Sequence, residues 1–412
     1  MMNTTLKTGI VAALLMATFT QAQAKQWTLA DCVNYALANN ISLKKTKVQQ
    51  LSAFEDVKQS QAALLPSLSF STSQNITYQP WPQTGRQTVT DGYVQSSVDK
   101  TYYNGSYSVS GNWTVWNGGR NTNQVKLNKL TEQMAVLDSA QTANTILEQI
   151  AQYYVQILYS TEAIKVNKAS LETSQKNEER GKTMVGVGKM SKADLAQLTA
   201  QRAQDEYNIV EAESNLRNYK RQLKQLLQIT DDEEFDVVIP ATTDAMALEE
   251  VPALNAVYTA TIEHRPEIKA AQLGVESSDL SVKIAKAQRM PTIGLNAGVS
   301  TSTNSMSTDA WGSQMKTNFN VGGGLTVSIP LFDNRSSKTA ANKAMLQRET
   351  YLLDLKDKQT TLYSTVENYW LQANTNQSQF KAAKVSSESA QTSYDLLSEQ
   401  FKLGLKNIVE LR

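Results

Sequence analysis

Apolar and polar residues follow a helical period over one very long stretch of this chain. From about residue 120 to residue 186, apolar residues recur three and four positions apart, as at Ile146, Ile150 and Tyr153. The stretch contains no proline, and its first glycine is Gly181. A helical period kept for so long predicts one helix on the order of 100 Å, which requires coiled-coil packing. A second long helix is expected from about residue 335.

Four shorter segments follow a period of two instead. They lie within 67–78, 107–115, 292–299 and 318–329, and small neutral residues alternate there with apolar ones. A soluble sheet also alternates, but its water-facing side normally carries charged residues. These segments contain no charge, and four of the six tryptophans fall in or beside them. Their length of about ten residues matches tilted strands that cross a bilayer. We therefore expect membrane-spanning strands, which several chains must pool because four strands cannot close a barrel.

The chain also repeats itself. Residues 38–70 align without gaps on residues 263–295, with Pro66 on Pro291, and both copies change period directly after this proline. Trp116-Asn117-Gly118-Gly119-Arg120 corresponds to Phe332-Asp333-Asn334-Arg335, and each precedes a long helical pattern. Glycine turns follow in both copies, at Gly188 and Gly404. The repeat predicts two copies of one unit: helix, β-hairpin, long helix, tight turn and helix.

The start of the chain predicts export. Lys7 precedes an apolar run from Ile10 to Phe19, and Ala22-Gln23-Ala24 follows it. This is the arrangement of a secretory signal peptide, cleaved before Lys25. No other stretch is apolar for long enough to form a transmembrane helix.

These patterns give the expected organisation. Residues 1–24 are a signal peptide, and 25–228 are the first repeat, with its β-hairpin at about 67–116 and its long helical hairpin at about 120–228. Residues 229–262 are an equatorial connector of turns and a short strand. The second repeat, 263–412, has its hairpin at about 292–332 and a long helix from about 335. Its final helix is expected to be truncated.

Composition argues against several classes of function. The chain has 40 basic and 39 acidic residues, so it has no field that would attract nucleic acid. Cys32 and His264 are the only cysteine and histidine, which excludes an intramolecular disulfide, a multi-histidine metal site and a catalytic triad. We expect no cofactor, no metal and no enzymatic activity.

Several motifs together resemble the TolC-type outer-membrane efflux proteins. They are the exported start, the opening from Trp27 to Asn40, the paired prolines before strands, the Pro-Leu-Phe-Asp-Asn turn at 330–334 and the glycine turns. The resemblance implies a homotrimer in which three chains each give four strands to a 12-stranded β-barrel in the outer membrane of a Gram-negative bacterium. Below it, the helices form an α-helical barrel across the periplasm.

The same resemblance implies the function and the partners. Members of the family are exit ducts of tripartite efflux pumps or type I secretion systems. They work with a periplasmic adaptor (a membrane fusion protein) and an inner-membrane transporter of RND or ABC type.

It also implies the functional residues. The adaptor-contact tip is expected at the two glycine turns: Val187, Gly188, Lys189, Met190, Ser191, Leu403, Gly404, Leu405, Lys406 and Asn407. The gate is expected at Asp194, Lys406 and Glu410, where Glu410 replaces the aspartate usual in the family. The transitions between barrel and helices are expected at Pro66, Pro291, Pro330 and Asp333.

Two alternatives remain. A periplasmic coiled-coil scaffold with surface β-hairpins would explain the long helices and the export signal, but not four charge-free strands. A carbohydrate-binding exported protein could use the tryptophans, but would need carboxylates near them, and the strands contain none.

Overall fold

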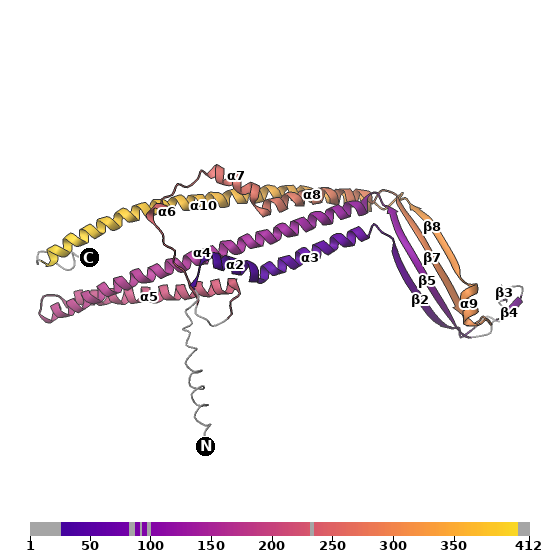
Figure 1. Ribbon diagram of the computed structural model, residues 1–412, viewed down its shortest axis with the longest axis horizontal. Coiled ribbons are helices and arrows are strands. Elements are labelled where there is room, and N and C mark those ends of the chain that lie inside the picture. Colours follow the sequence, from indigo (N-terminus) through magenta and orange to yellow (C-terminus); the bar gives the residue numbers. More distant parts are fainter. Residues whose placement is uncertain (1–25, 82–86, 91–92, 97–99, 231–234, 403–412) are drawn as a thin grey trace, which may run out of the picture. The chain divides into compact units, whose positions relative to one another are not determined.

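The computed structural model describes residues 26–81, 87–90, 93–96, 100–230 and 235–402, in two units (Figure 1). Unit 1 comprises Met1–Lys47, Ser139–Val257 and Val366–Arg412, and unit 2 comprises Val48–Asp138 and Tyr258–Thr365. The expected signal peptide, the second glycine turn and the end of the chain lie outside the described residues.

The first copy contains two shorter helices, a long helical hairpin and five strands. In chain order they are β1 (Gln26–Trp27), α2 (Leu29–Asn39), α3 (Ile41–Ala62), β2 (Ser67–Tyr78), β3 (Gln87–Thr90), β4 (Tyr93–Ser96), β5 (Thr101–Trp116), α4 (Arg120–Gly186) and α5 (Lys192–Leu227).

The connector and the second copy follow. Their elements are β6 (Asp236–Val237), α6 (Asp244–Ala247), α7 (Leu254–His264), α8 (Pro266–Ala287), β7 (Thr292–Asn304), α9 (Trp311–Thr317), β8 (Asn320–Ser328) and α10 (Ser336–Lys402).

The two copies match in the helix before the hairpin, in the two long strands and in the long helix. Helices α3 and α8 have 22 residues each, and α8 begins 225 positions after α3, which is the spacing found in the sequence. Helices α4 and α10 have 67 residues each and begin 216 positions apart. The difference of nine residues between the two spacings lies in the hairpins, so the first hairpin is the longer one.

The hairpins of both copies form one antiparallel sheet in unit 2. Its strand order is β2-β5-β7-β8, so the pairing of β5 with β7 joins the two copies. Strands β2 and β8 are the two edges of this sheet. The small hairpin of β3 and β4 forms a separate sheet and, like α9, interrupts a loop for which the sequence patterns predicted nothing.

Unit 2 also contains α8, α9, the end of α7 and parts of α3, α4 and α10. Within it, Asn128 of α4 donates its side-chain amide to the carbonyl of Asp56 in α3, at 3.1 Å. Arg348 of α10 forms an ion pair with Asp279 of α8. Each long helix is therefore tied to the shorter helix of its own copy.

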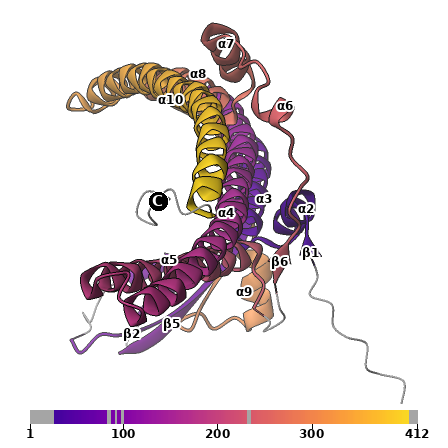
Figure 2. The same cartoon turned by 90° about the vertical axis from the view of Figure 1, so that its left-hand side faces the viewer.

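The core of unit 1 forms where α2, α4 and α5 meet a small parallel sheet of β1 and β6. Its largest fully buried side chains are Cys32, Ile150, Ile157, Leu223 and Leu227. Helices α4 and α5 lie side by side beyond this core (Figures 1 and 2). The long apolar stripe of α4 thus packs as a coiled-coil stripe must.

The connector differs from the expectation of turns and one short strand. It contains α6 and most of α7 besides β6. The stretch from Asp244 to Pro252 runs along α10 and is held there by three α10 side chains seven positions apart. Trp370 donates to the carbonyl of Pro252 (2.9 Å), Gln377 to that of Glu249 (2.8 Å), and Lys384 pairs with Asp244 (2.7 Å). Seven residues make nearly two helical turns, so these side chains share one face of α10. The physical reason for the missed elements is that tertiary contacts of this kind have no local pattern.

Candidate functional site: an amphipathic sheet and a helical tip

The four-stranded sheet of unit 2 has one polar face without any charge. Hydrogen-bonded register brings small polar residues and glycines into rows that cross all four strands. Three such rows are Ser67, Asn112, Asn296 and Gly324; Ser69, Ser110, Gly298 and Gly322; and Ser71, Ser108, Ser300 and Asn320. None of the four strands contains Asp, Glu, Lys, Arg or His.

Serine hydroxyls pair across β2 and β5 on this face. The Oγ atoms are 2.7–3.0 Å apart in three successive pairs: Ser69 with Ser110, Ser71 with Ser108, and Ser73 with Ser106. Each hydroxyl still has hydrogen-bonding capacity left, because a hydroxyl offers one donor and two acceptor sites. The face can therefore be wetted without attracting ions of either sign.

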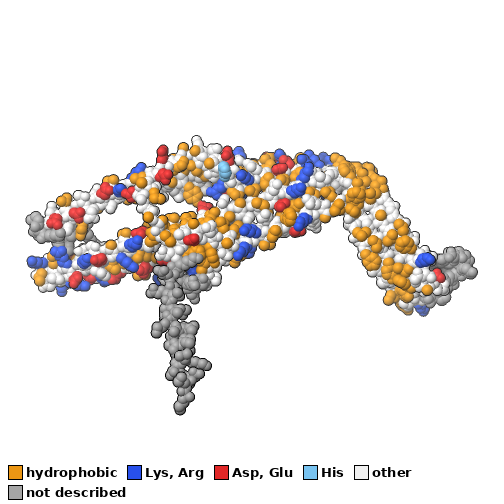
Figure 3. Space-filling view, in the orientation of Figure 1, with side chains coloured by type: hydrophobic (Ala, Val, Ile, Leu, Met, Phe, Trp, Pro, Cys, Tyr) orange, Lys and Arg blue, Asp and Glu red, His pale blue; other side chains and the backbone are white. Residues whose placement is uncertain are grey.

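The opposite face of the sheet is apolar and exposed. Leu68 is 79% exposed, Phe70 67%, Val321 73% and Leu325 65%. Figure 3 shows hydrophobic side chains gathered over the sheet. Soluble proteins rarely leave a contiguous apolar surface of this kind uncovered, so it marks contact with a membrane or a partner.

Helix α9 covers this face at its far end. The ring of Trp311 packs edge-on against that of Tyr107, with centroids 6.2 Å apart, and Thr301 donates its hydroxyl to the carbonyl of Met315. Residues Tyr107 and Thr301 lie directly opposite each other on the apolar side. Helix α9 therefore covers the apolar face at this rung, whereas Ile76 on β2, further along the same face, is 80% exposed.

The predicted transition residues stand where the helices meet the sheet. Pro66 and Pro291 each precede the first residue of a strand, and Pro330 lies two residues after β8. Asp333 accepts a hydrogen bond from the backbone N–H of Ser337 at 2.8 Å. Hydrogen bonds from Ser337 hold the pKa of the Asp333 carboxyl below its usual value.

Two consecutive left-handed residues lead into each long helix. Gly118 and Gly119 have φ of +69° and +77°, and Asn334 and Arg335, at the matching positions, have +51° and +66°. Glycine adopts this conformation without steric cost, whereas arginine does not. At Gly118 a side chain is excluded twice, since an added Cβ would lie 2.5 Å from the Cβ of Met290.

The helical tip lies between α4 and α5. Gly188 has φ of +74°, and Ser191 caps α5 by accepting a hydrogen bond from the N–H of Asp194 at 3.1 Å. The Ser191 hydroxyl donates to the Asp194 carboxylate at 2.7 Å. Of the predicted tip and gate residues, Val187 to Ser191 and Asp194 are thus brought together in one turn. Leu403, Gly404, Leu405, Lys406, Asn407 and Glu410 lie outside the described residues.

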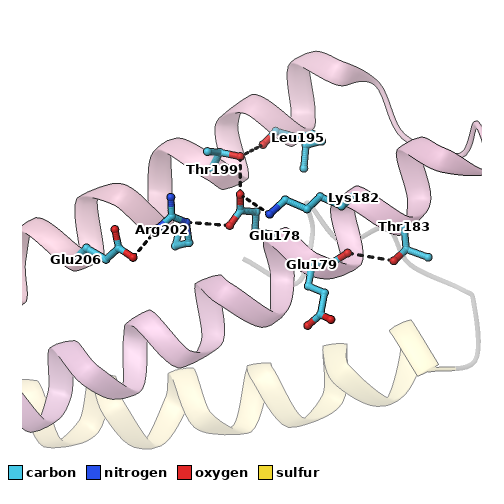
Figure 4. A network of polar contacts seen from close by, with 8 residues as sticks. All are labelled: Glu178, Glu179, Lys182, Thr183, Leu195, Thr199, Arg202 and Glu206. Carbon is cyan, nitrogen blue, oxygen red and sulfur yellow. Dashed lines mark hydrogen bonds and ion pairs between the residues drawn. The ribbon is translucent and has the colours of Figure 1, made fainter.

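A network of charges links α4 to α5 close to this tip (Figure 4). The side chain of Glu178 is only 9% exposed and accepts from Arg202 (2.9 Å), Lys182 (3.1 Å) and Thr199 (3.0 Å). Arg202 also pairs with Glu206. The hydrogen bond from Lys182 is the main reason why the pKa of Glu178 is lowered. The network holds the two helices in one register next to the turn.

Sequence reasoning did not find this network, although a signal for it exists. The buried positions of α4 include Ile150, Ile157, Ile164, Ser174 and Glu178. Continuing the three- and four-residue spacing beyond Ile164 therefore reaches Glu178. A carboxylate at a core position of a coiled coil requires a cationic partner, which α5 supplies.

The described residues contain no group of three or more His, Cys, Asp or Glu side chains that could hold a metal ion. Cys32 is buried, and burial raises the pKa of its thiol to about 11, so the thiol is protonated and unreactive at neutral pH. Within the described part of the chain, no helix combines the length and the hydropathy that a bilayer crossing requires.

The family model for outer membrane efflux proteins matches residues 32–227 and 257–412, a stretch in each copy. The chain belongs to this family. Membership confirms the predicted family and function class, that of outer-membrane efflux channels. The scaffold and carbohydrate-binding alternatives do not account for it.

A relative of this outer membrane efflux protein carries a name of the same function class. The toxin and drug export protein A of Aggregatibacter actinomycetemcomitans is 24% identical over 373 residues, which are 90% of this chain and 74% of that protein.

Solved structures show the same fold. A structure of CusC superposes with a TM-score of 0.78 at 16% identity, over 95% of this chain and 88% of that chain. The outer membrane protein VceC of Vibrio cholerae gives 0.75 at 16% identity, over 93% and 88%. The predicted mainly helical, internally duplicated fold is thereby confirmed.

Proposed function

We propose that three copies of this chain form one outer-membrane duct, a 12-stranded barrel continued by a periplasmic α-helical barrel. The observation that carries the proposal is the open sheet. It has an exposed apolar face, a charge-free polar face and two edge strands, β2 and β8.

The two faces assign the sides of the barrel. Leu68 and Phe70 face lipid, because moving their exposed apolar side chains from water into lipid is favourable. Ser69 and Ser71, which alternate with them, face the lumen. Strands of 9–16 residues are long enough to cross the apolar layer when tilted.

The edges and the lumen together set the number of copies. In lipid, an unpaired edge leaves backbone N–H and C=O groups unsatisfied at several kcal/mol each, so β2 of one copy must pair with β8 of the next. Two copies would give eight strands, and side chains nearly fill the interior of a barrel of that size. Three copies give 12 strands and an open lumen.

The tip of α4 and α5 is the docking site for a periplasmic adaptor, which joins the duct to an RND or ABC transporter in the inner membrane. Val187 supports this role, since it is 65% exposed in a turn between two helices and contacts no core. The transporter supplies the energy, and the duct is a conduit and not an enzyme.

The gate is formed by Asp194, Lys406 and Glu410, as the family resemblance implies. Asp194 already stands at the tip, held by Ser191. Replacing Glu410 with Gln removes one charge, so single-channel conductance in planar bilayers should rise. Equal conductance of the variant and the wild type in properly inserted trimers would contradict this role.

Disulfide cross-linking of the two edge strands tests the ring. Ser71→Cys on β2 is combined in turn with Asn320→Cys, Gly322→Cys and Gly324→Cys on β8, in a Cys32→Ser background. Because each copy carries both edges, one of the three combinations should give linked dimers and trimers, and no larger species, on non-reducing gels.

Each single cysteine variant serves as the control and should stay monomeric on the same gels. Monomers from all three combinations, or a ladder that continues beyond the trimer, would refute the closed ring of three.

Export and membrane location are tested separately. The signal peptide should be cleaved before Lys25, which mass spectrometry of the mature N-terminus measures. The protein should resist carbonate washing and require detergent for extraction. A protein that washes off would be the periplasmic scaffold.

Cross-linking in cells from cysteines at Lys189 and Leu405 tests docking at the tip. The expected product contains a periplasmic adaptor. Capture from a cysteine on the barrel, such as Phe70→Cys, should yield none.

A further inference from the structure

A groove opens between α3, α4, α8 and α10 within unit 2. Its volume is about 580 Å³, which lies in the range of pockets that bind drug-sized molecules. We propose that this groove binds an amphipathic cation of that size. The proposal goes beyond the duct function, because a conduit needs no binding site in its wall.

Small residues leave the space open. Ala53, Ala135 and Ala271 line it from three different helices, where larger side chains would fill it. Gly274 lets Tyr351 approach α8 closely, since an added Cβ would lie 3.3 Å from Cδ1 of the tyrosine ring. The groove therefore has an apolar floor with one aromatic ring, that of Tyr351. This residue is 37% exposed.

More carboxylate side chains than cationic side chains line the groove. Asp56, Asp354 and Asp357 are exposed there and make no ion pair with any residue that the structure describes. Asp138 lines the groove as well, and Lys358 is its one cationic lining residue. Four carboxylates against one ammonium give the site a net negative charge, which attracts a cation and repels an anion.

The shape of the groove favours a small molecule over a helix of a partner protein. Its lining extends from Gln49 to Asp56 on α3 and from Tyr351 to Lys358 on α10. Seven residue steps correspond to about 10 Å along a helix axis, which is less than two helical turns. An apolar group on the small-residue floor with its positive charge toward Asp354 and Asp357 uses both halves of this surface. Tyr351 adds a ring on which an onium group can stack.

Equilibrium dialysis with tetraphenylphosphonium tests the site on the detergent-solubilised protein, with empty micelles as the blank. Saturable binding of one cation per chain is expected. Tetraphenylborate has the same size and shape with the opposite charge, so it should show no saturable binding above the blank.

Two kinds of variant examine the contacts. Asp354→Asn and Asp357→Asn should each weaken binding about three- to tenfold, since each removes one charge near the ligand. Ala271→Trp should abolish binding by filling the floor, while circular dichroism reports an intact helical fold. Glu349→Gln is the matched control, because Glu349 is exposed on α10 but does not line the groove.

Binding of the two ions with equal affinity, absence of saturable binding, or an equal effect of Glu349→Gln and Asp354→Asn would each overturn the proposal. Failure here is distinct from failure of the duct. Wild-type protein that conducts ions in bilayers without binding tetraphenylphosphonium refutes the groove alone, and protein that binds without conducting refutes the duct alone.

Discussion

Replacing Gly118 with Ala should destabilise the junction between sheet and helix for two separable reasons. The residue has φ of +69°, a conformation that L side chains rarely adopt. In addition, the new Cβ would lie 2.5 Å from Cβ and 2.9 Å from Cγ of Met290. Real Cβ atoms do not approach other carbons so closely, so α8 or the turn must shift.

The two terms can be estimated separately. A left-handed alanine costs about 1–2 kcal/mol, and forcing extra atoms into a packed site costs about 1–3 kcal/mol. The expected loss of unfolding free energy for Gly118→Ala is therefore about 2–5 kcal/mol. Gly119→Ala should lose only about 1–2 kcal/mol. Gly119 has φ of +77°, but the atom nearest to an added Cβ would be the side-chain amide nitrogen of Asn123, at 3.7 Å.

Thermal unfolding in detergent, followed by circular dichroism, measures this order. The melting temperature should fall from wild type to Gly119→Ala and further to Gly118→Ala. Gly186→Ala is a control that should be stabilised. Gly186 is the last residue of α4, and an added Cβ would have no atom within 4 Å. The free energy of unfolding should therefore rise by about 0.4–1 kcal/mol.

A second substitution identifies the contact. Met290→Gly should restore part of the loss in Gly118→Ala, whereas Met290→Ala should restore little, because alanine keeps the clashing Cβ. If Gly118→Ala has the same melting temperature as Gly119→Ala, the close approach to Met290 does not cause the loss of stability. The same follows if Met290→Ala restores as much stability as Met290→Gly.

Three further predictions concern unit 1. Because the folded-state pKa of Glu178 is lowered from 4.5, its charge stabilises the fold above that pH, and the contribution is lost as pH falls through the folded value. Glu178→Gln should therefore lower the melting temperature at pH 7 and have no effect in strong acid, while the exposed Glu179→Gln should be neutral throughout; a pH-independent loss would contradict the ion network. If Lys406 belongs to the proposed gate, Lys406→Ala should raise single-channel conductance in planar bilayers, and unchanged currents would exclude it from that gate. Trp370→Phe loses the indole donor that holds the connector to α10, so a glutamyl-specific protease should cut at Glu249 faster than in wild type; equal rates would mean that this hydrogen bond does not restrain the connector.

Much of the fold could be predicted because its elements carry their own periods. Helix α4 occupies Arg120–Gly186, where apolar residues three and four apart continue without a proline. The strand starting at Ser67 follows directly on Pro66, where alternation replaces the helical period. Both signals are local, and both are long enough to outweigh single exceptions.

What was missed depends on contacts between distant parts of the chain. Helix α9 has only seven residues and is held by the sheet beneath it. The partners Glu178 and Arg202 meet because the intervening turn folds α5 back onto α4. The groove beside Tyr351 of α10 arises from small residues on three other helices, none of which is distinctive in the sequence.

The nine-residue difference between the two copies has a consequence for symmetry. Two identical halves in each chain would make a three-copy ring sixfold, with every hairpin and every helical turn in the same surroundings. In the ring of three copies that we propose, unequal hairpins would leave only threefold symmetry, and two kinds of site would alternate around the circumference. A duct built from one kind of chain would thus present two different surfaces at each of its ends.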